Sequence, residues 1–108
     1  MAVHTADDSN FKTLLNDNDK VIVKFYASWC GTCRLMAPKF KRVSEEDDNS
    51  DVTFLDVNAE QNEEARSLVG VDNLPFFATF ENGELKDSTF TGKFETVEAM
   101  LNDLKQSA

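Results

Sequence analysis

Two cysteines, Cys30 and Cys33, constrain this chain more than any other feature, because they stand where a strand pattern ends and a helix pattern begins. Residues 21–27 read Val-Ile-Val-Lys-Phe-Tyr-Ala, an apolar and β-branched stretch that is typical of a buried strand. Residues 34–44 are typical of a helix. With two residues between them, the sulfurs can meet across the first helical turn, so the pair can close a disulfide or supply half of a metal site.

The cysteine count narrows these alternatives. The chain has two cysteines, too few for a disulfide-stapled secreted mini-protein. A four-ligand metal site needs two more Cys or His, and only His4 remains, so a metal would require a second chain. We therefore expect no metal site, and we expect His4 to be a surface residue without a role. Inert core thiols are the remaining alternative.

Size and charge define the class of protein. At 108 residues, with 41% apolar and 29% charged residues, the chain is expected to be one globular domain. A net charge of −9 makes nucleic-acid and membrane-surface roles unfavourable. Acidic residues cluster at 45–48 and 60–64; these clusters form either a solvated face or a surface that steers basic partners. The N-terminus lacks the basic start and apolar core of a signal peptide, so a cytoplasmic location is expected.

Apolar spacing and turn residues predict an alternating β-α order. Residues 10–17 are expected to form a helix with Ser9 as its N-cap. Strands are expected at 3–4, 20–27, 52–57, 74–80 and 85–91, and further helices at 33–46, 60–69 and 94–104. Strands 20–27 and 52–57 should be parallel, since a helix connects them, whereas Asn82-Gly83 predicts an antiparallel hairpin.

The helices should each bury one stripe. In the helix over 33–46, Pro38 should introduce a kink. Gly70 suits the C-cap of the helix over 60–69. The side chains expected to be buried are Leu35, Met36, Phe40 and Val43 in the first of these helices, Ala65, Leu68 and Val69 in the second, and Phe94, Val97, Leu101 and Leu104 in the last.

Several of these features together resemble the thioredoxin family over nearly the whole chain. They are the Trp-Cys-Gly-Thr-Cys sequence of residues 29–33, the strand before it, Pro38, Leu74-Pro75, Asn82-Gly83 and Gly92. The resemblance implies an α/β thioredoxin fold in one domain over residues 1–108. This fold has a central mixed five-stranded sheet flanked by four helices, with a cis peptide bond at Leu74-Pro75.

The resemblance also implies a function, that of a protein disulfide reductase acting as an electron carrier. Cys30, at a helix N-terminus that favours its thiolate, would attack a target disulfide, and Cys33 would resolve the mixed disulfide. No bound cofactor is implied. The partners would be a thioredoxin reductase and oxidised protein disulfides, and the protein would be a monomer. The expected docking patch around Cys30 consists of Trp29, Gly31, Leu74, Pro75 and Gly92.

Three departures from the family pattern modulate this expectation. Thr32 stands where proline is usual. This position tunes the reduction potential in the family, so the sequence does not fix the reduction potential of the cysteine pair. Lys24 stands at the position of the family's buried aspartate, and Asp56 stands where a lysine is often found, so the two are expected to form a reversed pair. The alternatives are a snorkelling Lys24 and a plain surface Asp56. Phe76 replaces a threonine after the proline and should make the substrate groove bulkier.

Two other functions compete with the reductase. A thioredoxin-fold binding module with little turnover would be consistent with Lys24, Thr32 and Phe76. An oxidase or isomerase is the third hypothesis, and the absence of a signal peptide argues against it.

Overall fold

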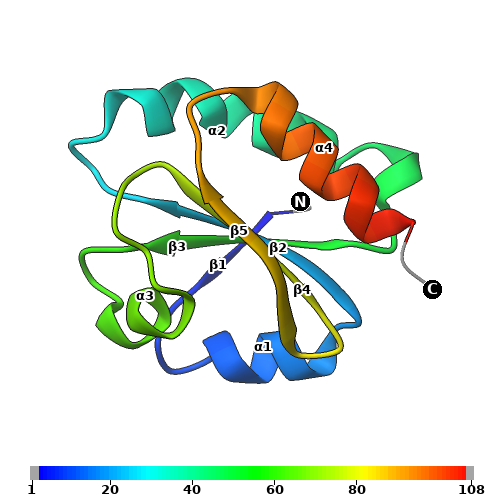
Figure 1. Ribbon diagram of the computed structural model, residues 1–108, viewed down its shortest axis with the longest axis horizontal. Coiled ribbons are helices and arrows are strands. Elements are labelled where there is room, and N and C mark those ends of the chain that lie inside the picture. Colours follow the sequence, from blue (N-terminus) through cyan, green and yellow to red (C-terminus); the bar gives the residue numbers. More distant parts are fainter. Residues whose placement is uncertain (1–2, 107–108) are drawn as a thin grey trace.

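The sheet at the centre of the molecule is built from the β-branched and aromatic stretches of the sequence. A computed structural model describes residues 3–106, which form five strands and four α-helices (Figure 1). The strands are β1 (Val3–Ala6), β2 (Lys20–Tyr26), β3 (Thr53–Asn58), β4 (Phe76–Glu81) and β5 (Glu84–Phe90). The helices are α1 (Phe11–Asp17), α2 (Gly31–Ser44), α3 (Glu63–Val69) and α4 (Phe94–Lys105), and a short 3₁₀ helix spans Asp47–Asn49.

The sheet is mixed, as predicted. Its strand order is β1-β3-β2-β4-β5; β1 and β2 run parallel to β3, whereas β4 runs antiparallel to both β2 and β5. The expected parallel pairing of β2 with β3 is confirmed. β2 is the central strand and is buried from Val21 to Phe25, in agreement with its nearly continuous apolar sequence.

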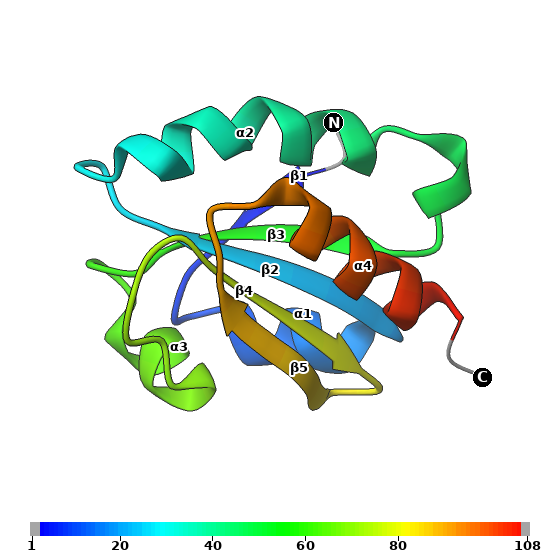
Figure 2. The ribbon, with the colours of Figure 1, turned by 45° about the horizontal axis from the view of Figure 1, so that its top comes forward.

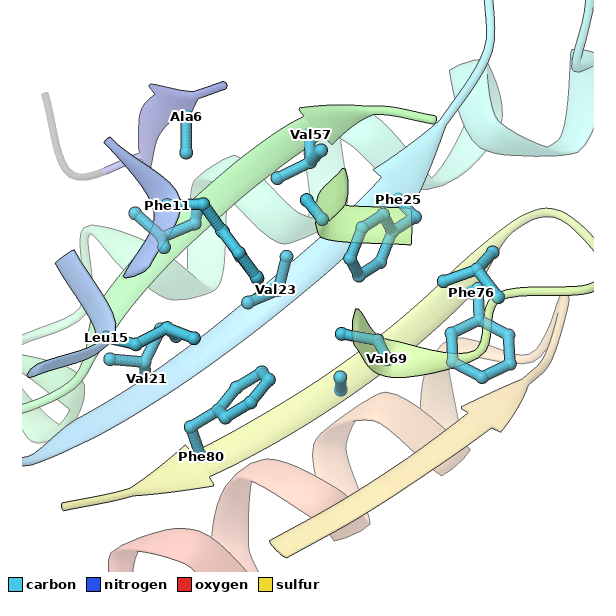
Figure 3. Close-up of a cluster of buried hydrophobic side chains, with 14 of the residues drawn as sticks. Ala6, Phe11, Leu15, Val21, Val23, Phe25, Val57, Val69, Phe76 and Phe80 are labelled. Carbon is cyan, nitrogen blue, oxygen red and sulfur yellow. The ribbon is translucent and has the colours of Figure 1, made fainter. Parts of the chain in front are cut away.

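Helices cover both faces of the sheet. α2 and α4 lie on one face and α1 and α3 on the other (Figures 1 and 2). Side chains of β2 alternate between the two faces. Val21, Val23 and Phe25 enter the cluster beneath α1 and α3 (Figure 3), and Ile22 enters the cluster beneath α2 and α4. Lys24 follows the same alternation and therefore faces α2.

Two chain reversals contain glycines with the positive φ angles that the sequence predicts. Gly70 ends α3 with a positive φ of 79°, so its predicted role as a C-cap is confirmed. Asn82 and Gly83 have φ values of 53° and 83°, the pair of positive angles that a tight β4–β5 hairpin needs. The antiparallel pairing of these two strands confirms the hairpin.

The start of α1 differs from the prediction. The N-cap is Asn10 rather than Ser9, and its side chain caps no helical amide. Asp7 Oδ1 instead accepts from the backbone amides of Ser9 and Asn10 at 2.9 and 3.2 Å. The carboxylate thus forms a local turn with Ser9 and Asn10, and the helix begins one residue later.

Two leucines expected in the core are exposed. Leu35 is 74% exposed and Leu68 is 50% exposed. Each helical residue turns by about 100°, so Leu35 lies well away from the buried face that Cys33, Met36 and Phe40 form. The same geometry places Leu68 beside the buried stripe of α3 rather than within it. The remaining helix residues predicted to be buried are buried, and the kink at Pro38 stays a prediction.

Candidate active site

The two cysteines lie at the junction between β2 and α2, where the sequence predicted them. They form a disulfide, with 5.3 Å between their Cα atoms. Cys30 is the N-cap of α2, and its Sγ accepts a hydrogen bond from the backbone amide of Cys33 at 3.2 Å. This amide and the other free N–H groups of the first turn favour negative charge on Cys30 Sγ. In the oxidised pair both residues are nearly covered, Cys30 at 5% and Cys33 at 3% exposure.

Trp29 presents its indole beside the disulfide rather than filling the core. It is 65% exposed. Its Nε1 donates to Glu60 Oε2 at 2.7 Å, so the ring is held from the loop that follows β3. No local motif indicates this role for Glu60. Nothing local could reveal this role, because 31 residues separate the two partners.

Leu74-Pro75 and Gly92 lie at the same end of the sheet as the motif. β4 pairs with β2 so that Phe76 is opposite Phe25, which brings the residues just before β4 next to the end of β2. The bond between Leu74 and Pro75 is cis, as the resemblance implied. Pro75 O accepts from the amide of Thr91, which precedes Gly92, at 3.2 Å.

Gly92 lies against the dipeptide between the cysteines. A Cβ atom at Gly92 would be 3.2 Å from Thr32 Cγ2, closer than most such contacts. Gly31, Thr32 and Gly92 are all exposed, and Leu74 is partly buried. The structure thus places the exposed residues Thr32 and Gly92 beside the buried Pro75, near the disulfide.

The expectation for Phe76 is wrong. Its side chain is 6% exposed and belongs to the core cluster shown in Figure 3, where it packs edge-on to Phe25 with 6.4 Å between ring centroids. The reason is the strand register, since side chains directly opposite each other share one face of the sheet. Phe76 therefore fills the core beneath α1 and α3 and does not make the groove bulkier.

Lys24 and Asp56 form the expected reversed pair. They are register partners on the parallel strands β2 and β3, with Lys24 Nζ 3.3 Å from Asp56 Oδ1. Lys24 is only 4% exposed, so the snorkelling alternative is wrong. Its ammonium group also lies 5.6 Å from the centroid of the Tyr26 ring and 5.4 Å from that of Phe40. These rings stabilise the buried cation.

A cavity of about 240 Å³ connects this pair to the disulfide. Its lining residues are Lys24, Tyr26, Ala27, Ser28, Cys33, Arg34, Ala37 and Asp56. Burial raises the pKa of Asp56, and the neighbouring Lys24 offsets this only in part. Burial also raises the pKa of Tyr26, and the Asp56 carboxylate adds to the effect. Tyr26 and Arg34 also line the cavity, and their position flanking the motif is the only sequence signal that could have indicated this.

Residues 3–106 contain no group of three or more His, Cys, Asp or Glu side chains that could hold a metal ion. In the same range no helix is long and apolar enough to cross a membrane. What the site contains is a disulfide with one sulfur at a helix N-terminus, an exposed aromatic side chain beside it, and a charged pair behind the second sulfur. Such an arrangement can exchange disulfides with another molecule.

Comparison with known proteins agrees with this chemistry. The sequence profile of the family described as Thioredoxin matches residues 2–106. The chain is 38% identical to thioredoxin-1 of Schizosaccharomyces pombe over 84 residues, which cover 78% of this chain and 80% of that protein. It is 33% identical to the thioredoxin of Alicyclobacillus acidocaldarius over 106 residues, which cover 97% of this chain and 100% of that protein.

A similar fold occurs in a crystal structure of the complex of ferredoxin:thioredoxin reductase with thioredoxin f2. The TM-score is 0.87 at 23% identity, covering 94% of each chain. The match to the family profile spans almost all of the sequence and includes both cysteines. The chain therefore belongs to the thioredoxin family and is a thiol-disulfide oxidoreductase that reduces protein disulfides.

Proposed function

We propose that Cys30 is the sulfur that attacks target disulfides and that Cys33 resolves the mixed disulfide. The observation that carries this assignment is the position of Cys30 as the N-cap of α2, with its Sγ accepting from the Cys33 amide. A thiolate at a helix N-terminus is stabilised by the free amides there, and the thiolate is the nucleophile in disulfide exchange. Cys33 lies one turn further into the helix and faces the cavity behind the motif.

The exchange proceeds in two steps that balance. In the first, the Cys30 thiolate attacks one sulfur of the target disulfide, a mixed disulfide forms, and the other target sulfur leaves as a thiolate. In the second, the Cys33 thiolate attacks Cys30 Sγ, and the remaining target sulfur leaves. The cysteine pair has then lost two electrons and the target disulfide has gained two, and each departing thiolate takes up a proton.

The surface beside the disulfide is suited to an extended target segment. Trp29 offers an exposed indole that Glu60 holds in place. Gly92 is exposed and Leu74 is partly buried, and the backbone before Pro75 can pair with a target strand as in strand addition. A target that binds there would be held by apolar contacts and backbone hydrogen bonds, which suits many different sequences.

The cysteine pair itself carries the electrons, so no bound cofactor is required. A reductase must return two electrons to the pair after each turnover, and the thioredoxin f2 complex with ferredoxin:thioredoxin reductase supports a thioredoxin reductase as that partner. We also propose a cytoplasmic location, because a dithiol reductant works where the surroundings keep its cysteines reduced.

A single substitution tests the assignment of the two sulfurs. Cys33→Ser should leave Cys30 able to attack insulin but unable to release it, so a stable one-to-one adduct accumulates while turnover is lost. Mass spectrometry after alkylation measures the adduct, and turbidity of reduced insulin in the presence of dithiothreitol measures turnover. The matched variant Cys30→Ser should form no adduct.

The opposite result is equally clear. If the unmodified chain forms its disulfide normally yet reduces no insulin above the rate of dithiothreitol alone, the protein is a binding module and the assignment fails.

A further inference from the structure

The outer side of α2 is a surface to which the exchange described above gives no role. We propose that a ridge on this helix, formed by Leu35, Lys39 and Arg42, binds an acidic flank of the target next to its disulfide. These three side chains are the α2 ridge. The inference rests on the proposed function, since it names a class of target for the same cysteine pair.

The α2 ridge leads away from the cysteine pair along the outside of the molecule. Its residues are spaced four and three apart, and residues at such spacings are neighbours on one side of a helix. All three are exposed, whereas the opposite side of α2 is buried. Figure 2 shows α2 lying along one side of the molecule, with its first turn joined to β2. A target held at Cys30 can therefore continue along the ridge.

The charge of α2 is opposite to that of the whole molecule. The helix has four of the eleven lysines and arginines of the chain and none of its twenty aspartates and glutamates. Within residues 3–106, the side chains of Lys39 and Arg42 form no ion pair and no hydrogen bond. Two neighbouring cations thus lack a carboxylate partner in a chain of net charge −9. Carboxylates of a bound target would complement them.

The other two cations of the helix lie off the ridge. Arg34 lines the cavity behind the disulfide, and its Nη2 donates to the backbone oxygen of Ser28 at 2.9 Å. Lys41 follows Arg34 by seven residues, or about two turns, so it lies on the same flank of the helix. The cations that a segment running outward from the disulfide can reach are therefore Lys39 and Arg42.

Helix and strand dimensions set the spacing that a target needs. The ridge residues lie five, nine and twelve positions after Cys30, which is about 7.5, 13.5 and 18 Å along the helix axis. An extended segment advances about 3.3 Å per residue, so its second, fourth and sixth residues from the target cysteine reach these levels. Alternate residues of such a segment point to the same side. The ridge therefore suits an apolar residue at the second position and carboxylates at the fourth and sixth.

The far end of the α2 ridge limits the acidic part of the target. Residues 45–48 read Glu-Glu-Asp-Asp, follow α2 directly and are exposed. Their charge repels carboxylates beyond the sixth position of the target and attracts lysines there. The preferred flank is therefore acidic over a short stretch and basic after it.

Two peptides of identical composition test the proposal on the reduced full chain. Each has one cysteine in a disulfide with thionitrobenzoate and a leucine at the second position after it. The first peptide has glutamates at the fourth and sixth positions and lysines at the eighth and tenth, and the second has these pairs exchanged. When the Cys30 thiolate attacks the peptide sulfur, the mixed disulfide forms and thionitrobenzoate leaves as a coloured thiolate. Its absorbance gives the second-order rate constant.

Both peptides are also made with the charged flank before the cysteine, because the direction in which a target crosses the site decides which flank meets α2. In one direction, the first peptide should react about fivefold faster than the second at low ionic strength, since it gains two surface ion pairs. The ratio should fall towards one in 0.5 M salt. The two peptides have the same net charge, so the negative field of the whole molecule acts on them alike.

A charge reversal on the ridge has a matched control on the other face of the sheet. Lys39→Glu should abolish or reverse the preference for the first peptide. Lys12→Glu changes the net charge by the same amount at an exposed lysine of α1 and should keep the preference. Leu35→Ala should slow both peptides alike, because both have the leucine.

The outcomes separate this inference from the proposed function. Equal rates for the two peptides in both directions would overturn the inference and leave the function intact. A preference that Lys39→Glu and Lys12→Glu lower equally would overturn it too, since it would then depend only on net charge. If no peptide releases thionitrobenzoate faster with the reduced chain than with a chain whose cysteines are alkylated, the proposed function fails and the inference fails with it.

Discussion

The Lys24–Asp56 pair places two opposite charges in the interior, directly behind Cys33. Removing charges from water is expensive, and a close partner repays this only in part. Here the balance is uneven, since burial raises the pKa of Asp56 in spite of the nearby ammonium group. The native state thus binds a proton on Asp56 more tightly than the unfolded chain does, which has a direct consequence for stability.

We expect the contribution of Asp56 to the free energy of unfolding to fall as pH rises. The folded-state pKa is raised above the ordinary value of 3.8. Its favourable contribution is therefore fully present below pH 3.8 and is lost as pH rises through the raised pKa. Urea unfolding of the oxidised protein and of Asp56→Asn, at several pH values from below 3.8 upwards, measures this contribution. It is the difference between the free energies of unfolding of the two proteins.

The sign of this difference is the test. The unmodified protein should lose stability relative to Asp56→Asn as pH rises, since the variant has no carboxyl group to ionise there. A difference that stays constant, or that grows in favour of the unmodified protein, would contradict the raised pKa.

At the scale of elements, α3 depends on a residue from a distant part of the chain. Its N-cap, Asn62, makes no side-chain cap. The carboxylate of Asp8 performs this function instead, with Oδ1 accepting from Ala65 N at 2.8 Å and Oδ2 accepting from Glu64 N at 3.2 Å. Asn62 Oδ1 in turn accepts from Asp8 N at 2.9 Å, so the loop before α1 and the start of α3 are tied together.

Asp8→Ala should therefore destabilise the protein through α3. Loss of a helix cap costs about 1 kcal/mol, and two amides here would lose their acceptor. Urea unfolding measures the global effect, and hydrogen exchange of the Ala65 amide measures the local one. Asp8→Asn keeps one oxygen acceptor, so its free energy of unfolding should lie between those of the unmodified protein and Asp8→Ala. Unchanged exchange at Ala65 in Asp8→Ala would show that α3 does not need this cap.

The whole molecule carries a strong negative charge, with a net charge of −9. Part of it lies near the site, since Glu60 holds the Trp29 indole and Glu63 and Glu64 open α3 shortly after it in the chain. A field of this sign attracts positively charged partners and repels negatively charged ones, and salt screens it over about 10 Å at 0.1 M.

We expect this field to appear in the rate of reduction. A disulfide-containing peptide flanked by lysines should be reduced faster than the same peptide flanked by glutamates, by about tenfold at low ionic strength. The ratio should fall towards one in 0.5 M salt. Equal rates for the two peptides at low salt would show that the acidic clusters are only a solvated face.

Much of the fold could be predicted because its elements are encoded locally. The alternation of apolar residues, the Asn82-Gly83 turn and the Gly70 cap each act within a few neighbouring residues. The predictions that failed concern side chains whose burial depends on how a helix packs against the rest of the molecule. Leu35 and Leu68 are apolar residues in genuine helices, but the direction in which each side chain points depends on how the helix is docked on the sheet.

Local patterns specify the elements and the strand-to-helix position of Cys30 and Cys33, and the family resemblance implies their redox chemistry. The surroundings of the two sulfurs depend instead on how distant segments pack together. Strand register paired Lys24 with Asp56 and turned Phe76 into the core, and a long-range hydrogen bond joined Trp29 to Glu60. The physical reason is that these contacts join segments far apart in the sequence, so no local pattern specifies them.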